Sequence, residues 1–199
     1  MAFSLADGEF LVRTARKTIE SYISSGKHLK VEADEKFRKK LGVFVTLETH
    51  PKRELRGCIG YPYPTEPLID ALVKSAVSAA VFDPRFPPVS KEELDGLVIE
   101  VTVLSEPKLI EGDKKELPNK VKIGKHGLII EYGPFSGLLL PQVAIEHGWS
   151  PEDFLAQCCW KAGLSPDMWL DKNSLVYCFE GQIFAEESPN GKIVEKKIK

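Results

Sequence analysis

The segment LRGCIG at residues 55–60 has the residue types and spacing best suited to chemistry in this chain. In an extended strand the side chains alternate between two faces, so Arg56, Cys58 and Gly60 would share one face. A fixed positive charge beside a sulfur favours the thiolate, which is the nucleophilic form of cysteine. We therefore predict Cys58 as a catalytic nucleophile or redox thiol, with Arg56 beside it as a substrate contact.

Two glycines in one short strand are unusual, because glycine packs no side chain and costs backbone entropy. Gly57 and Gly60 suit a strand that another group must approach closely, so we predict that they leave room for a substrate. The competing interpretation makes Cys58 a small buried hydrophobic residue, and the sequence leaves both open. The remaining cysteines are predicted to be structural: Cys158, Cys159 and Cys178.

Asp83 and Arg85 belong to the segment DPRFPP, a rigid turn after an apolar helical stretch. One interpretation is structural: Asp83 would accept nearby backbone amides, and Arg85 would pair with a carboxylate or stack on Phe86. The other is an anion clamp that orients an anionic or polar substrate. Both residues are therefore candidate substrate contacts.

His126 stands between Gly124 and Gly127 at the start of a predicted strand, where it could act as a general base for Cys58. A lone loop histidine is also common as a plain surface residue. Gln142 is the polar residue in the otherwise apolar segment 137–143, and we include it as a candidate substrate contact.

No metal site is predicted. The four histidines and four cysteines show no Cys-x-x-Cys, His-x-x-x-His or Cys-x-x-His spacing, and adjacent cysteines would close only a strained disulfide ring. The glycine-rich phosphate-binding motifs Gly-x-Gly-x-x-Gly and Gly-x-x-x-x-Gly-Lys are both absent from the sequence, so nucleotide binding loses its usual support. The sequence names no cofactor.

The composition indicates a soluble chain of 199 residues, 43% of them hydrophobic, with room for a second small lobe. No apolar stretch approaches the length of a membrane span and no signal segment is evident, so we expect the cytoplasm. Because 27 basic residues nearly balance 29 acidic ones, nucleic-acid binding is disfavoured. The basic run Lys36–Lys40 is either a solvated connector or a phosphate-binding patch.

Hydrophobic periodicity predicts hairpins and helices without regular βαβ alternation, which is typical of an α+β fold with antiparallel sheets. The charged segment 105–120 is predicted to be a loop and a lobe boundary, and the tail 188–199 is predicted to fray. The predicted helices are 5–24, 65–81, 141–147 and 151–162. The predicted strands are 43–49, 55–60, 97–104, 127–132, 137–140 and 175–187, the last broken near Gly181.

Several motifs, taken together and in order, resemble those of the AMMECR family. They are LRGCIG at 55–60, FDPRF at 82–86, KHGL at 125–128, LLLPQ at 138–142 and KAGL at 161–164. The resemblance runs from the first helix to the last strand and predicts a single AMMECR-type domain over residues 1–199. It implies one larger and one smaller lobe around a cleft lined by residues 55–60, with the smaller lobe within about 84–130.

The resemblance also implies an unsettled function, because members of this family are widely regarded as uncharacterised. Some lie beside, or are fused to, Memo-type and radical S-adenosylmethionine proteins, which suggests a modification or redox pathway. Our first hypothesis is an enzyme or accessory enzyme centred on Cys58. The second is a non-catalytic module that binds a metabolite or a protein, and nucleic-acid regulation ranks third. The sequence does not indicate an oligomeric state.

Overall fold

The computed structural model describes residues 3–197 of the chain. Their contacts divide the chain into two compact units. Unit 1 combines residues up to Leu104 with Gln182–Lys197, and unit 2 comprises Ser105–Gly181. Residues 84–130, where the smaller lobe was expected, fall partly in each unit.

The α+β class with antiparallel strands is confirmed. The helices are α1 (Leu5–Ser25), α2 (Leu68–Val81), α3 (Leu117–Lys120), α4 (Pro141–Glu146) and α5 (Pro151–Lys161). The strands are β1 (Val43–Thr49), β2 (Leu55–Tyr61), β3 (Leu97–Leu104), β4 (Lys108–Leu109), β5 (His126–Tyr132), β6 (Phe135–Leu139), β7 (Leu175–Glu186) and β8 (Ile193–Lys196). Short 3-10 turns occur at Glu35–Phe37, Leu94–Gly96, Lys114–Glu116 and Met168–Leu170.

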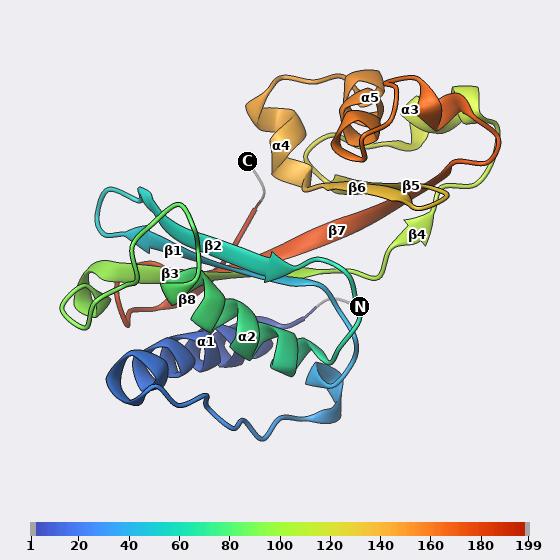
Figure 1. The fold of residues 1–199 in the computed structure, drawn as a ribbon. Coiled ribbons are helices and arrows are strands. Elements are labelled where there is room, and N and C mark those ends of the chain that lie inside the picture. The colour runs from blue at the N-terminus through green and yellow to red at the C-terminus, as the bar shows by residue number, and fades with distance from the viewer. Residues whose placement is uncertain (1–2, 198–199) are drawn as a thin grey trace. The chain divides into compact units, whose positions relative to one another are not determined.

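Unit 1 is a sheet with two helices on one face. β1 pairs antiparallel with β2 on one side and with β3 on the other, and β8 pairs with the C-terminal part of β7. Figure 1 shows α1 and α2 together on one face of the β1–β3 sheet. Alternate residues of β1 that face the core, Val43, Val45 and Leu47, are buried, as the period-two pattern predicts.

Both ends of α1 follow from local sequence. Ser4 and Asp7 form a reciprocal capping box, in which each side chain accepts the other residue's backbone N–H. Gly26 ends the helix in the left-handed conformation, with φ of 68°. The helix predicted over 65–81 begins later than expected, since α2 starts at Leu68 after Pro67. A residue before proline is disfavoured in the helical conformation, and this delays the start of the helix.

A buried ion pair joins α1 to β7 within unit 1. Arg16 is buried and donates from Nε to Oε1 of Glu186 at 2.7 Å and from Nη2 to Oε2 at 2.5 Å. Glu186 also accepts the backbone N–H of Ile99 at 3.1 Å, and Arg16 donates to the carbonyl of Leu97. These bonds compensate for the removal of both charges from water, so the pair is structural.

Unit 2 has its own sheet, in which β5 lies between β6 and the N-terminal part of β7, and β4 pairs with β7. The predicted hairpin is confirmed, with a tighter turn than expected: only residues 133–134 separate β5 from β6. Ser150 and Asp153 form a second capping box at the start of α5. In unit 2, α5 covers the β5–β6 hairpin (Figure 1).

Three predictions about segments are corrected. Segment 105–120 is not simply a loop, because it contains β4, a 3-10 turn and α3. β7 is continuous through Gly181, although the two units divide there. Residues 193–196 of the tail do not fray, since β8 pairs with β7 and Ile193 is buried in the core. Residues 198–199 of that tail lie outside the described part.

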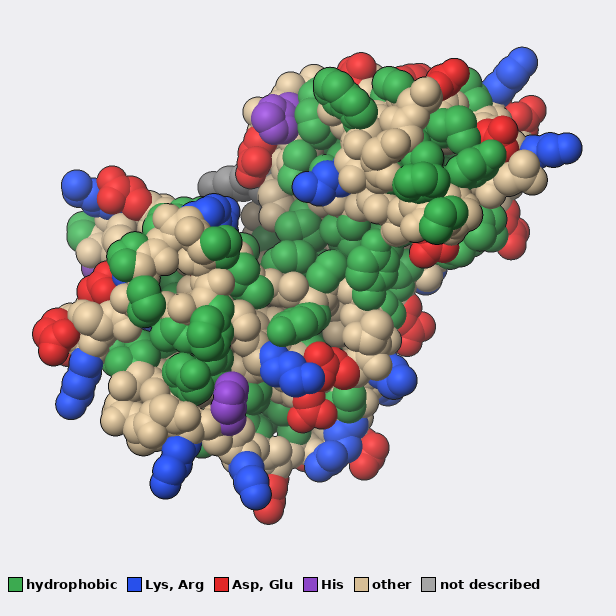
Figure 2. Space-filling model, in the orientation of Figure 1, with side chains coloured by type: hydrophobic (Ala, Val, Ile, Leu, Met, Phe, Trp, Pro, Cys, Tyr) green, Lys and Arg blue, Asp and Glu red, His purple; other side chains and the backbone are tan. Residues whose placement is uncertain are grey.

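The surface carries mixed charge. Figure 2 shows acidic and basic side chains interspersed on the visible face. In the basic run, the Lys36 ammonium forms an ion pair with Asp7 and lies 5.1 Å from the centre of the Phe37 ring, whose side chain is buried in the core. Among residues 3–197, no helix is both long and apolar enough to cross a membrane.

Candidate functional site

Cys58 lies in the middle of β2, which is the edge strand of the unit 1 sheet. It stands directly opposite Thr46 of β1, and the Thr46 hydroxyl donates a hydrogen bond to the Cys58 sulfur at 3.2 Å. Such close side chains are typical of a non-hydrogen-bonded pair in an antiparallel ladder. In such a pair the backbone N–H and C=O of each residue point away from the partner strand. The polar backbone groups of Cys58 therefore face the open edge of the sheet.

The Asp83 carboxylate and the Arg85 guanidinium occupy this edge. Oδ2 of Asp83 accepts the Cys58 N–H at 2.8 Å, and Nη2 of Arg85 donates to the Cys58 carbonyl at 3.1 Å. Arg85 also donates to Asp83 through Nε at 2.9 Å and Nη2 at 2.7 Å. We call these three residues the edge clamp. It satisfies backbone groups that would otherwise be free to pair with another strand.

The Asp83 carboxylate is buried, and its environment favours the charged form. Hydrogen bonds from Arg85, outweighing the opposing effect of burial, hold the pKa of Asp83 far below its usual range. The Cys58 and Arg85 backbone amides act in the same direction. The structural interpretation of the DPRFPP turn thus holds for Asp83, while Arg85 still exposes 54% of its side chain.

Arg56 does not lie beside the Cys58 sulfur. The β1–β2 register shifts between Leu47, opposite Gly57, and Glu48, opposite Leu55, so Arg56 is a bulged residue without a ladder partner. Its Nε and Nη2 donate to the two carboxylate oxygens of Glu93 at 2.8 and 3.1 Å. The bulge breaks the strict alternation on which the predicted Arg56–Cys58 face depended.

The ring of Phe86 lies near two guanidinium groups, those of Arg56 and Arg85. Its ring centre is 5.9 Å from Cζ of Arg56 and 5.5 Å from Cζ of Arg85. Arg56 is buried, and its Nη1 has no hydrogen-bond partner among the described residues. The face of the aromatic ring compensates for part of that loss through a cation–π interaction.

The Cys58 thiol is protonated at neutral pH. Burial raises its pKa above the ordinary value of 9.0, while the Thr46 hydrogen bond and the Arg85 charge oppose this only in part. The carboxylates of Glu100 and Asp83 raise the pKa further. The prediction that Arg56 promotes a thiolate is therefore wrong, because Arg56 is paired with Glu93 and the remaining environment favours the neutral form.

Protein atoms fill the space beside both glycines of the motif. A Cβ at Gly57 would lie 2.2 Å from the carbonyl oxygen of Ala79 in α2. A Cβ at Gly60 would lie 2.3 Å from the ring of Phe44 in β1. The glycines therefore let a helix and an aromatic ring pack against β2, and the prediction that they leave room for a substrate is wrong.

His126 and Gln142 belong to unit 2, and no contact of either with Cys58 is established. Nδ1 of His126 accepts the backbone N–H of Lys122 at 3.3 Å, which assigns the proton of the neutral ring to Nε2. Burial lowers the pKa of His126, so the ring is neutral at pH 7. Nε2 therefore carries the proton of the neutral ring and is a donor rather than a base. Gln142 is half-buried at the second residue of α4.

The other three cysteines have raised pKa values. Burial raises the pKa of Cys158 to about 12 and that of Cys159 to about 11, and burial also raises that of Cys178. The Cys158 thiol donates to the carbonyl of Gly137 at 3.4 Å. These environments are those of structural thiols. Within residues 3–197, no cluster of three or more His, Cys, Asp or Glu side chains could hold a metal ion.

Sequence reasoning missed Thr46, Glu93 and the role of Phe86. Thr46 could have been found by counting back from the turn between β1 and β2, had the bulge at Arg56 been known. Glu93 lies 37 residues from Arg56. No local signal connects the two. Phe86 was considered only as a stacking partner of Arg85, whereas it also contacts Arg56.

Comparison with known proteins gives a consistent result. The AMMECR1 family model matches residues 12–184. Protein PH0010 from Pyrococcus horikoshii is 53% identical over 205 residues and covers all of both chains. Protein MJ0810 from Methanocaldococcus jannaschii is 53% identical over 197 residues, covering 98% of each chain.

A solved structure agrees in fold. The crystal structure of the uncharacterized protein PH0010 superposes with a TM-score of 0.83 and 54% sequence identity, covering 96% of each chain. The names of these relatives state no activity. The family match and the extent of the alignments lead to one conclusion: this chain belongs to the AMMECR1 family.

Proposed function

We propose that the chain is a non-catalytic binding module whose recognition surface is the turn 82–88 together with the exposed end of the edge clamp. The observation that carries this proposal is that Arg85 is both fixed in position and exposed. Its guanidinium is held by Asp83 and Cys58, yet more than half of the side chain stays exposed to solvent. A fixed and exposed arginine is suited to recognition.

The clamp reduces the cost of binding. A free arginine side chain loses rotamer entropy when a partner fixes it, whereas Arg85 is already fixed before any partner arrives. Pro84, Pro87 and Pro88 stiffen the same turn through their fixed φ angles. Arginine and aromatic residues also dominate the energetics of protein interfaces.

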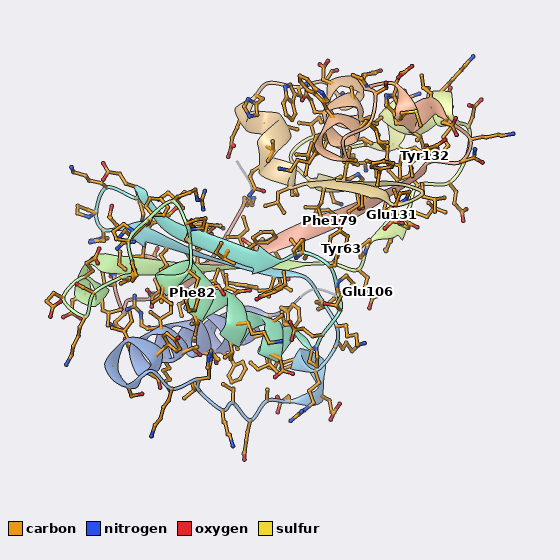
Figure 3. All side chains as sticks on the ribbon, in the orientation of Figure 1. Tyr63, Phe82, Glu106, Glu131, Tyr132 and Phe179 are labelled. Atoms are coloured by element: carbon orange, nitrogen blue, oxygen red, sulfur yellow. The ribbon has the colours of Figure 1, made fainter. Side chains whose placement is uncertain are left out.

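Phe82 supplies an apolar contact next to the clamp. It follows directly after α2 (Figure 3), and the residue is 63% exposed. Its ring is in an edge-to-face arrangement with the ring of Tyr22, with centres 6.4 Å apart. An exposed phenylalanine adjoining a preorganised arginine fits a protein partner better than a small metabolite, because neither side chain is enclosed.

The neutral thiol weighs against catalysis. An enzyme that used Cys58 as a nucleophile would need the thiolate at working pH, but burial raises the pKa of this thiol. His126 would have to accept a proton while its Nδ1 is already engaged by Lys122. The first hypothesis, an enzyme or accessory enzyme with a cleft at residues 55–60, therefore ranks below binding.

Purified Memo-type and radical S-adenosylmethionine proteins are the first partners to test, by isothermal titration calorimetry. We expect Phe82→Ala to weaken binding by about tenfold or more, as interface hot spots do. Cys58→Ala should leave the Kd within about twofold, because the thiol would not contact the partner. Leu5→Ala is the matched control, since it removes another exposed apolar side chain from unit 1.

Two results would end this proposal. One is an affinity that Phe82→Ala leaves unchanged. The other is an interaction, or a measured enzymatic activity, that Cys58→Ala abolishes while the protein stays folded. Lack of binding to both proteins would remove them as partners.

A further inference from the structure

Unit 2 contains a depression that is separate from the edge clamp and formed entirely by its own residues. It lies where the end of β6, the link between α4 and α5, and α5 itself meet. Its volume is about 290 Å³. The lining residues are Leu139, Trp149, Gln157, Trp160 and Lys161.

Two indole rings give this depression its character. Trp160 exposes 67% of its surface, which is a large apolar area to leave in water. Trp149 is held in place, since its ring stacks on His147 at 4.7 Å with an interplanar angle of 17° and lies 6.4 Å from the ring of Phe154. One wall is therefore fixed and the other is open to solvent. Flat aromatic walls favour a planar ligand.

The polar groups of the depression have no partner within the described residues. Neither the Lys161 ammonium nor the Gln157 side-chain amide makes a hydrogen bond or ion pair with any residue in 3–197. A lysine in the last helical turn does stabilise the helix dipole. That role leaves the three ammonium donors available to an anion.

We propose that this depression binds a small planar aromatic carboxylate. The ring would lie against Trp149 and Trp160, the carboxylate would pair with Lys161, and Gln157 would donate or accept a hydrogen bond. The volume falls just below the range of about 300–1,000 Å³ that is usual for drug-sized ligands, so a one- or two-ring acid fits better than a nucleotide. A cationic ligand is disfavoured because it would meet the Lys161 charge.

The test uses indole-3-acetate as the probe and the whole 199-residue chain labelled with ¹⁵N. Tryptophan side chains give separate N–H signals, which Trp→Phe substitutions assign. We expect the signals of Trp149 and Trp160 to shift and saturate, while that of Trp169, which is buried and outside the depression, stays in place. Indole-3-acetamide, the neutral analogue, should bind about threefold or more weakly, and tryptamine more weakly still.

Variants separate the ring contact from the charge contact. Trp160→Ala should weaken the binding of indole-3-acetate by about tenfold. Because Trp160 is exposed, the substitution should not unfold the protein, so the loss would report on binding. Lys161→Gln should weaken the binding of indole-3-acetate by about threefold and leave the affinity for indole-3-acetamide unchanged. Lys172→Gln, at another exposed lysine of unit 2, should change neither.

The proposal is overturned if the Trp149 and Trp160 signals do not saturate by about 10 mM probe, because the Kd would then be weaker than about 1 mM. It is also overturned if the acetate and the acetamide bind equally, or if Lys161→Gln and Lys172→Gln have the same effect.

Discussion

The buried carboxylate of Asp83 accepts the backbone N–H of Cys58 across 2.8 Å, so an acid 25 residues away in the chain closes the edge of the sheet at the centre of the LRGCIG motif. Two segments that look like independent candidate sites in the sequence are therefore one structural unit. The cysteine is important here for its backbone as much as for its sulfur. Arg85 completes the unit by binding the carbonyl of the same residue.

Asp83→Ala should destabilise the protein by about 2–4 kcal/mol, because it leaves the Cys58 amide and the Arg85 guanidinium without their acceptor. Arg85→Ala should cost less, about 1 kcal/mol, since Asp83 would keep two backbone amide donors. Urea unfolding measured for both variants checks the order. A loss below about 0.5 kcal/mol for Asp83→Ala would be within the range of an ordinary surface change and would contradict the clamp.

Acid should weaken the clamp. The folded-state pKa of Asp83 is lowered, so the stability it contributes is complete above its ordinary pKa of 3.8 and is lost as the pH falls below that value. The wild-type unfolding midpoint should therefore fall more between pH 6 and pH 3 than that of Asp83→Asn. Other carboxylates titrate in both proteins. The measured quantity is therefore the difference between the two proteins in the slope of the unfolding midpoint against pH. Equal slopes would exclude Asp83 as a source of acid sensitivity.

Local signals predicted most of the fold. The capping pairs Ser4–Asp7 and Ser150–Asp153 are readable in sequence, and the structure contains both boxes. Alternating apolar residues gave β1 and β3. The errors fell where long-range pairing decides the outcome: Ile193–Lys196 looks polar and terminal, yet it forms β8 because an edge of β7 is available to pair with it.

The sequence assigned two segments to one candidate site, and their proximity can be compared with the structure. Residues 55–60 and Asp83–Arg85 do come together. The placement of Arg56 could not be predicted, because a one-residue bulge redirects its side chain. No local sequence signal indicates that bulge. The thiol's environment likewise depends on burial and on Glu100 and Asp83, which only the folded chain brings near.

Gly57→Ala should destabilise the protein by about 1–3 kcal/mol, because the new methyl group would overlap the carbonyl oxygen of Ala79 and push α2 away from β2. Gly96→Ala is the control. A Cβ there meets no atom within 4 Å, and the residue does not have positive φ. Thermal unfolding of the two variants is the measurement. If Gly57→Ala were as stable as Gly96→Ala, the glycine would not be explained by close packing.

Cys58 should be slow to alkylate at neutral pH. Its pKa is raised above the ordinary 9.0, so the thiolate that reacts with iodoacetamide is scarce at pH 7 and increases only as the pH passes that value. Site-resolved mass spectrometry of labelling between pH 6 and pH 10 gives the apparent pKa. Thr46→Val removes the hydrogen bond that favours the thiolate, so it should raise the apparent pKa further. An apparent pKa below the ordinary value would restore the activated thiol and favour an enzyme over a binding module.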